Sequence, residues 1–230
     1  MNAALITGAN RGIGLAFAQS YAKDGWRVVA TCRTPAKAKE LDKLAAGSGG
    51  RVSVHALDVA DGKAIAALGK TLRAESIDVL LNNAGVYDPS PSFGHTDYDA
   101  WEQVFRVNTM AALRMAEVFV EQVARSDKKL MVGISSGMGS ITDNGSGGSY
   151  AYRTSKSALQ MVMRSLAMDL GGRGIIAVAM NPGWVRTDMG GPGGSLTPEE
   201  SARRMRAVFD MLTPNDSGKF WHHPGKEFPW

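Results

Sequence analysis

The chain alternates between short apolar runs and longer stretches in which apolar residues recur every three or four positions. Short apolar runs bounded by turn residues predict buried strands, and helical spacing predicts amphipathic helices. We expect strands over residues 3–7, 27–31, 51–55, 77–81, 130–134, 175–180 and 218–222. We expect helices that end near 24, cover 35–46, begin near 61, cover about 97–124, and begin near 150 and at 197.

This alternation predicts an α/β protein. The run at 77–81 is apolar on both faces, as in parallel strands covered by helices on both sides. A chain of 230 residues with 44% hydrophobic and 21% charged residues suits one domain with a substantial core. We therefore predict a single domain over 1–230, a Rossmann-type doubly wound parallel sheet of about seven strands with helices on both faces.

A glycine turn follows the first expected strand. The spacing of Gly8, Gly12 and Gly14 differs from the usual dinucleotide fingerprint, but the turn still leads into a helix. Glycines let the backbone approach a pyrophosphate, and the helix N-terminus offers free N–H groups. The alternative is a tight turn without a ligand.

The second expected strand ends without an acidic residue. An acid there would bind the adenosine ribose and exclude a 2′-phosphate. Arg33 occupies this region instead, and with Arg11 it is suited to a 2′-phosphate, which favours NADP(H) over NAD(H). The alternatives are exposed arginines, and Cys32 is expected to fill space rather than react.

The ends of two further strands carry polar residues. Asp58 is placed to contact adenine, or alternatively to cap the helix that begins near Asp61. Asn83 follows the strand at 77–81, in a segment of small residues that permits close approach of a cofactor ribose. Asn108 lies inside the expected helix over 97–124, where an asparagine indicates a local distortion or a bound water.

Tyr152 and Lys156 are four residues apart at the start of a helical pattern. That spacing puts both side chains on one helix face. A nearby ammonium group favours phenolate, so we expect Lys156 to lower the tyrosine pKa from about 10 toward a range useful for proton transfer. A Tyr and a Lys one turn apart also occur by chance, so the pair alone is weak evidence for catalysis. The motifs elsewhere in the chain strengthen the catalytic interpretation.

Charge and cysteine content limit the remaining functions. The net charge of +4 comes from scattered basic residues mixed with acids, so we expect no nucleic-acid partner. One cysteine, no signal peptide at the N-terminus and no apolar run of about 20 residues favour a cytoplasmic protein without a membrane partner. His222 and His223 lack a further ligand at suitable spacing, so we expect no metal site.

Taken together, these motifs resemble the short-chain dehydrogenase/reductase family. The glycine turn, Asp58, the segment 82–85, Asn108, Ser136, the Tyr152 and Lys156 pair and Pro182-Gly183 occur in the family's order between residues 7 and 187. The segments 150–159 and 182–189 and the terminal Trp230 resemble the carbonyl-reductase branch of the sniffer and C-factor type. The interval between Ser136 and Tyr152 is a little longer than is common in the family.

The resemblance implies a role for each residue in catalysis. Tyr152 would donate a proton to a carbonyl oxygen that Ser136 also binds, with Ser135 as the rival serine. Lys156 would lower the tyrosine pKa and hold the nicotinamide ribose, and Asn108 would position a water behind it. The residues expected to contact the cofactor are Gly8, Asn10, Arg11, Gly12, Ile13, Gly14, Arg33, Asp58, Val59, Asn83, Ala84, Gly85, Tyr152, Lys156, Pro182, Gly183, Val185 and Thr187.

We therefore predict NADPH-dependent reduction of a small aldehyde or ketone. The alternatives are a non-catalytic NADP-binding regulatory or signalling protein and an NAD-dependent alcohol dehydrogenase. The pocket is expected to draw on 87–95, 137–148, Trp184 and a mobile lid at 189–196. The helices over 97–124 and 150–171 are candidates for homodimer or homotetramer faces, or they simply cover the sheet.

Overall fold

An eight-stranded sheet forms the centre of the computed structural model, which describes residues 1–87 and 92–230. The strands follow the order β3-β2-β1-β4-β5-β6-β7-β8. Their bounds are β1 (Ala3–Ile6), β2 (Arg27–Cys32), β3 (Val52–Ala56), β4 (Val79–Asn82), β5 (Leu130–Ile134), β6 (Ile176–Asn181), β7 (Phe220–His222) and β8 (Lys226–Glu227). β1 to β7 are parallel, and only the pairing of β8 with β7 is antiparallel. The predicted Rossmann-type sheet is confirmed, with β8 as an unexpected eighth strand.

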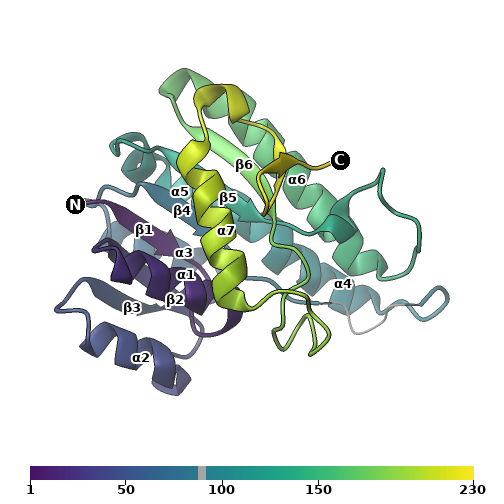
Figure 1. Cartoon of the computed structure of the whole chain (residues 1–230), viewed down its shortest axis with the longest axis horizontal. Helices are drawn as coiled ribbons and strands as arrows, with labels where there is room; N and C mark the ends of the chain where they lie inside the picture. Colours follow the sequence, from purple (N-terminus) through teal and green to yellow (C-terminus); the bar gives the residue numbers. More distant parts are fainter. Residues whose placement is uncertain (88–91) are drawn as a thin grey trace.

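Helices cover both faces of this sheet (Figure 1). Their bounds are α1 (Gly12–Lys23), α2 (Lys39–Ala46), α3 (Gly62–Thr71), α4 (Tyr98–Phe105), α5 (Ala111–Ala124), α6 (Tyr150–Leu170) and α7 (Pro198–Met211). The core on one face draws side chains from α1, α2 and α7. The core on the other face draws side chains from α3, α5 and α6.

Strand β4 shows why the strand segments read as continuous apolar runs. Val79 and Leu81 belong to the core that contains Phe17 of α1. Leu80 belongs to the opposite core with Phe119 of α5. Successive side chains of a strand point to opposite faces of the sheet. Because both faces are buried here, the residues that point to either face are apolar, and the strand reads as a continuous apolar run.

The helical pattern over 97–124 is interrupted at Asn108. The helix α4 ends at Phe105, a π-helix covers Arg106–Met110, and α5 begins at Ala111. The distortion expected around Asn108 is therefore confirmed. Short π-helical turns inside α-helices are frequent at functional sites.

Capping residues determine where two helices begin. Asp61 accepts hydrogen bonds from the backbone N–H groups of Lys63 and Ala64 at 2.8 and 3.3 Å, and so caps α3. Thr197 caps α7 as expected, with Pro198 at the first helical position. The helix expected over 35–46 is instead a 3₁₀ turn, Pro35–Lys37, followed by α2.

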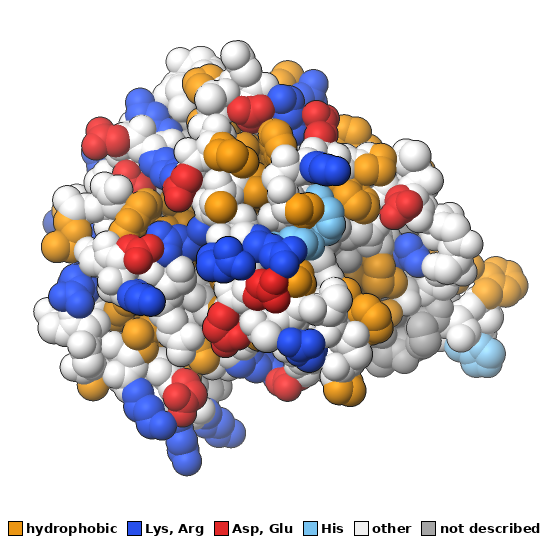
Figure 2. Space-filling view, in the orientation of Figure 1, with side chains coloured by type: hydrophobic (Ala, Val, Ile, Leu, Met, Phe, Trp, Pro, Cys, Tyr) orange, Lys and Arg blue, Asp and Glu red, His pale blue; other side chains and the backbone are white. Residues whose placement is uncertain are grey.

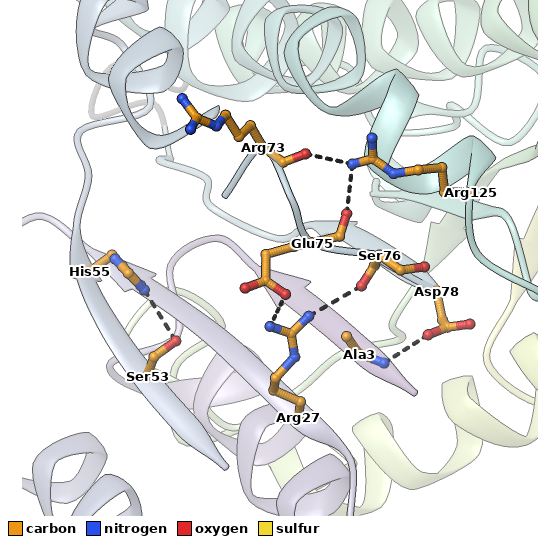
Figure 3. A network of polar contacts seen from close by, with 9 residues as sticks. All are labelled: Ala3, Arg27, Ser53, His55, Arg73, Glu75, Ser76, Asp78 and Arg125. Carbon is orange, nitrogen blue, oxygen red and sulfur yellow. Dashed lines mark hydrogen bonds and ion pairs between the residues drawn. The ribbon is translucent and has the colours of Figure 1, made fainter. Parts of the chain in front are cut away.

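A polar network fastens the amino ends of the central strands (Figure 3). Arg27 at the start of β2 forms an ion pair with Glu75, whose carbonyl oxygen accepts a hydrogen bond from Arg125 at 2.8 Å. The buried carboxylate of Asp78 accepts a hydrogen bond from the backbone N–H of Ala3 at 2.8 Å. These contacts hold the segment before β4 against the amino ends of β1 and β2. They occupy that end of the sheet, and the opposite end, where the strands finish, is open to a ligand.

Basic and acidic side chains are interspersed with apolar ones on the face shown in Figure 2. This arrangement agrees with charged residues that serve as solvated helix faces. None of the helices that the structure describes combines the length and the apolar character needed to cross a membrane. Among residues 1–87 and 92–230, no three His, Cys, Asp or Glu side chains gather as a metal site would require.

Candidate functional site

A cavity of about 630 Å³ opens at the carboxyl ends of the central strands, where ligands bind in open α/β sheets. Most residues predicted for the site line this cavity: Gly8, Asn10, Arg11, Gly12, Ile13, Gly14, Arg33, Asp58, Val59, Asn83, Ala84, Gly85, Tyr152, Lys156, Pro182 and Thr187. Four predicted residues are not part of its lining: Asn108, Ser136, Gly183 and Val185. Most residues that the sequence patterns singled out therefore lie around one cavity.

The glycine turn between β1 and α1 forms a tight backbone cradle. Gly8 and Gly12 have φ angles of 67° and 54°, in the left-handed region that favours glycine. A Cβ on Gly14 would lie 2.2 Å from the carbonyl oxygen of Gly8 and 2.6 Å from Nδ2 of Asn83. Because α1 begins at Gly12 and its first N–H groups lack helical partners, this cradle fits the phosphates of a dinucleotide.

Asn83 supports the cradle from the neighbouring strand. Its Nδ2 donates hydrogen bonds to the carbonyl oxygens of Thr7 and Gly8 at 2.9 and 3.2 Å. The hydroxyl of Thr7 in turn accepts hydrogen bonds from the backbone N–H groups of Asn83 and Ala84, each at 3.0 Å. The side chain of Asn83 therefore joins β1 to the exit of β4.

Basic side chains lie at the exit of β2 and in the glycine turn. Arg33 is exposed and lines the cavity. Arg11 also lines it and forms an ion pair with Asp188, from the segment after β6. Cys32 is buried in the core, and burial raises the pKa of its thiol, which agrees with the expected packing role.

Asp58 is not the cap of α3. Its Oδ1 accepts a hydrogen bond from the backbone N–H of Ala60 at 2.9 Å, while Asp61 caps the helix. The capping alternative for Asp58 is therefore wrong, because its side chain turns back on its own loop. The carboxylate remains at the cavity wall beside Val59, where a cofactor contact is geometrically open.

Tyr152 and Lys156 lie together in the first two turns of α6, as their spacing predicted. Both side chains are buried, with 7% and 4% of their surface exposed, and both line the cavity. Nζ of Lys156 lies 5.6 Å from the centre of the Tyr152 ring. It donates a hydrogen bond to the carbonyl oxygen of Ile134 at 2.8 Å. Gly85 lies next to the ammonium group, since a Cβ there would be in ordinary contact with Nζ at 3.6 Å.

The expectation that Lys156 lowers the pKa of Tyr152 is wrong for this structure. Burial raises the pKa of Tyr152 to about 12, although hydrogen bonding to Ser136 acts in the opposite direction. Burial also lowers the pKa of Lys156 to about 8. The physical reason is that both groups lose water, and the loss of hydration disfavours each charged form more than the pair gains from proximity.

Of the two neighbouring serines, Ser136 is the one that lies next to the phenol of Tyr152. Ser136 lies close enough to the phenol to act against the rise of its pKa, and its Oγ accepts a hydrogen bond from the backbone N–H of Met138 at 3.1 Å. Ser135 lines the cavity, but its hydroxyl donates to the carbonyl oxygen of Lys156 at 3.2 Å and accepts from Nε2 of Gln160 at 3.0 Å. The hydroxyl of Ser135 is therefore committed to α6, which favours Ser136 as the serine beside a reacting oxygen.

Asn108 lies behind Lys156 and joins three segments. Its amide accepts a hydrogen bond from the backbone N–H of Val86 at 2.8 Å and donates one to the Val86 carbonyl oxygen at 2.9 Å. It also donates to the hydroxyl of Ser155 at 3.0 Å. Asn108 therefore ties the exit of β4 to α6, and this contact positions Lys156 within the same helix.

The other segments expected around the pocket contribute unequally. Tyr87 and Met189 line the cavity, whereas Trp184 and the residues 137–148 are absent from the lining that the structure describes. Pro89 and Pro91 of the expected loop lie outside the described residues. The segment 137–148 is bound to α6, because Arg153 donates hydrogen bonds to the carbonyl oxygens of Met138 and Gly147 at 3.2 and 3.1 Å.

Two features of the site had no signal in the sequence. Asp188 meets Arg11 across a separation of 177 residues. The helix α4 contributes Gln103 and Val104 to the cavity, a function that its amphipathic pattern did not distinguish from core packing. The sequence motif around Pro182 included Asp188, but only the fold brings it to the glycine turn.

Comparison with known proteins agrees with this geometry. Residues 2–195 match the family model described as short chain dehydrogenase. The C-signal protein of Myxococcus xanthus is 40% identical over 154 residues, which cover 67% of this chain and 93% of that protein. The structure of the carbonyl reductase Sniffer of D. melanogaster superimposes with a TM-score of 0.92 at 30% identity, covering all of both chains.

A third similar protein was crystallised with a cofactor. The NADPH-bound carbonyl reductase from chicken fatty liver is 34% identical, with a TM-score of 0.92 and coverage of 100% of this chain and 98% of that one. The order of motifs along this chain, the parallel sheet and the cavity that gathers them point the same way. The protein belongs to the short-chain dehydrogenase family and is an NAD(P)-dependent oxidoreductase that acts on carbonyl or hydroxyl groups.

Proposed function

We propose that this protein reduces an aldehyde or ketone to an alcohol with NADPH, and that Tyr152 donates the proton. The observation that carries the proposal is the placement of Tyr152, beside Ser136 and one turn from Lys156, at the wall of a cavity with a phosphate cradle. The similarity to carbonyl reductases, one of them bound to NADPH, supports the choice of reaction and cofactor.

The chain's own residues would divide the work as follows. The glycine turn and the N-terminus of α1 hold the cofactor phosphates, and Lys156 is placed to hydrogen-bond a ribose. When bound, the nicotinamide would supply hydride for the carbonyl carbon. Tyr152 then gives its phenolic proton to the carbonyl oxygen, which Ser136 also hydrogen-bonds. Asn108 acts through its contacts with Val86 and Ser155, which hold α6 against the exit of β4.

The protonation state of Tyr152 favours the reductive direction. A phenol with a pKa of about 12 keeps its proton at neutral pH, which is the form needed to donate to a carbonyl oxygen. Oxidation of an alcohol would need the phenolate as base, and burial disfavours that form. This argument weighs against the alternative of an alcohol dehydrogenase working at neutral pH.

Arg33 supports the choice of NADPH over NADH. Its guanidinium is exposed at the cavity wall after β2, the place where the adenosine end of a dinucleotide lies in such folds. An arginine there can form charge-assisted hydrogen bonds with a 2′-phosphate, which NADH lacks. Val185 is buried and absent from the cavity lining, so Thr187 is the better placed of these two expected cofactor contacts.

The test is NADPH oxidation with a panel of aldehydes, quinones and small diketones, comparing the wild type with Tyr152→Phe. Loss of a proton donor should lower kcat by about 10²- to 10⁴-fold while NADPH binding is retained. Tyr98→Phe is the matched control, because Tyr98 is 74% exposed and stacks on Trp101 rather than in the cavity. A Tyr152→Phe variant as active as the wild type would contradict the proposal.

A signalling role is the second candidate, raised by the 40% identity to the C-signal protein. It would be favoured if the wild type bound NADPH but turned over nothing on the panel.

Homodimer formation also remains a proposal: Leu113 of α5 and Met161 and Met168 of α6 are exposed apolar side chains on the helices considered for it. Light scattering of the purified protein would decide between a monomer and a dimer.

A further inference from the structure

Tyr87 packs against the proposed proton donor. The two rings lie with their centres 4.8 Å apart and their planes tilted by 46°. Tyr152 is almost completely buried, whereas 42% of Tyr87 is exposed, and both line the cavity. Tyr87 therefore covers one side of the Tyr152 ring and separates it from solvent.

The hydroxyl of Tyr87 is fastened to the start of the same helix. It forms a hydrogen bond of 2.8 Å with Oγ of Ser149, the residue immediately before α6. Tyr87 and Ser149 are 62 residues apart, and the bond connects the exit of β4 to the helix that carries Tyr152. The ring of Tyr87 thus contacts Tyr152 in the first turn of α6, and its hydroxyl bonds the residue that immediately precedes this helix.

Ser149 has an unusual backbone conformation. It lies in the left-handed region, with φ 45° and ψ 46°, which costs a non-glycine residue free energy. A serine before a helix ordinarily caps it, but the hydroxyl of Ser149 makes no capping bond within the described helix. In this conformation the hydroxyl bonds Tyr87 instead. The contact therefore forms although α6 lacks a side-chain cap and the backbone of Ser149 is strained.

The backbone next to Tyr87 is also held. Val86 exchanges two hydrogen bonds with the side chain of Asn108, of 2.8 and 2.9 Å. Asn108 donates a third bond to Ser155, whose hydroxyl donates to the carbonyl oxygen of Tyr152 at 2.7 Å. Tyr87 is therefore constrained at its backbone and at its hydroxyl, and its ring has little freedom to leave Tyr152.

We propose that Tyr87 is a positioning residue for proton transfer, which acts by holding the ring of Tyr152 through packing and through its bond to Ser149. This inference rests on the proposed function, because it assumes that Tyr152 donates the proton. Its consequence is that Tyr87 controls kcat more than KM, since a small displacement of the phenol affects the chemical step more than substrate binding.

The first test compares Tyr87→Leu and Tyr87→Phe in NADPH oxidation with the best carbonyl substrate of the panel. Tyr87→Leu removes ring and hydroxyl, and we expect kcat to fall about 10- to 100-fold with NADPH affinity unchanged. Tyr87→Phe keeps the ring, and we expect a loss of only about 3- to 10-fold. Tyr98→Leu is the matched control and should leave kcat unchanged, because Tyr98 lies outside the cavity lining.

The second test is a double-mutant cycle. If the bond between Tyr87 and Ser149 does the positioning, Tyr87→Phe and Ser149→Ala each break it, and the double variant should be no slower than either single variant. Ser149→Gly separates positioning from stability, because glycine accepts the left-handed conformation yet lacks the hydroxyl. We expect Ser149→Gly to unfold no more readily than Ser149→Ala while showing the same loss in kcat.

A third readout does not depend on turnover. In Tyr87→Leu, water reaches the Tyr152 ring, so its phenol should ionise at lower pH than in the wild type, measured by ultraviolet absorbance against Tyr152→Phe in the same background.

Three results would overturn the inference: a Tyr87→Leu variant with unchanged kcat and raised KM, multiplicative losses in the cycle, or an unchanged ionisation of Tyr152. If Tyr152→Phe itself retains activity, the proposed function fails instead, and the two failures are thereby distinguishable.

Discussion

Lys156 donates its hydrogen bond to the carbonyl oxygen of Ile134 at 2.8 Å, while Tyr152, one helical turn earlier, lies beside Ser136. The two residues are neighbours on α6, but each is held by a different part of the β5 exit. Their proximity therefore does not by itself create a phenolate. Burial dominates both groups, and this has measurable consequences.

Lys156→Met should change how stability depends on pH. The pKa of Lys156 is about 8 in the folded chain, against 10.5 for an ordinary lysine, so between these values the unfolded chain binds a proton that the folded chain does not. The contribution of Lys156 to the free energy of unfolding therefore becomes more favourable as the pH rises across that window, by on the order of 2 kcal/mol. The advantage of Lys156→Met over the wild type at pH 7 should shrink accordingly by pH 10, measured by urea unfolding. Lys63→Met, at an exposed lysine, is the control, and a constant difference would contradict the prediction.

The Tyr152 phenol should remain protonated well into the alkaline range. Its pKa of about 12 predicts that the absorbance difference between wild type and Tyr152→Phe shows no phenolate below about pH 11. The measurement is an ultraviolet titration of the protein without added cofactor. A one-tyrosine step below pH 10 would instead mean that Lys156 outweighs burial.

Arg33→Ala should weaken NADPH binding selectively. Charge-assisted hydrogen bonds contribute about 1.5–3 kcal/mol, so the NADPH Kd should rise about 10- to 100-fold with little change for NADH. Fluorescence titration with both cofactors measures this, with Arg51→Ala as the control because Arg51 is exposed and absent from the cavity lining. Equal losses for both cofactors would remove Arg33 from recognition of the phosphate.

Asp188→Asn should make NADPH binding tighter. Asp188 pairs with Arg11 at the cavity wall, and both side chains are largely exposed, 75% and 68%, so the pair is worth less than about 1 kcal/mol. Its removal frees Arg11 for an anionic ligand, and we expect a Kd about two- to fivefold lower at low salt, with the gain reduced at high salt. A higher Kd would show that the pair is needed to hold the segment after β6.

Gly14→Ala should abolish cofactor binding and destabilise the fold. The added Cβ would lie 2.2 Å from the carbonyl oxygen of Gly8, a backbone atom that cannot move without opening the cradle. Overpacking of this kind costs about 1–3 kcal/mol. Gly172→Ala is the control, since a Cβ there meets nothing within 4 Å. Thermal unfolding and NADPH titration of both variants test the prediction, which normal binding by Gly14→Ala would exclude.

Features that depend on neighbouring residues could be predicted from the sequence. Apolar runs and helical spacing predicted the alternating elements, and the pair Tyr152 and Lys156 was visible because a helix brings residues four apart together. Asn108 signalled a distortion because its amide competes with backbone hydrogen bonds, and the π-helix Arg106–Met110 is that distortion.

Properties that depend on distant residues or on burial could not be predicted from the sequence and emerge from the packed fold. The pKa values of Tyr152 and Lys156 follow from loss of water, and that depends on which segments cover α6. The same holds for the contacts of Arg11 with Asp188 and of Tyr87 with Ser149, which join positions 177 and 62 residues apart. Periodicity is a local property of the chain, whereas hydration and long-range contact exist only once the sheet and its helices have packed.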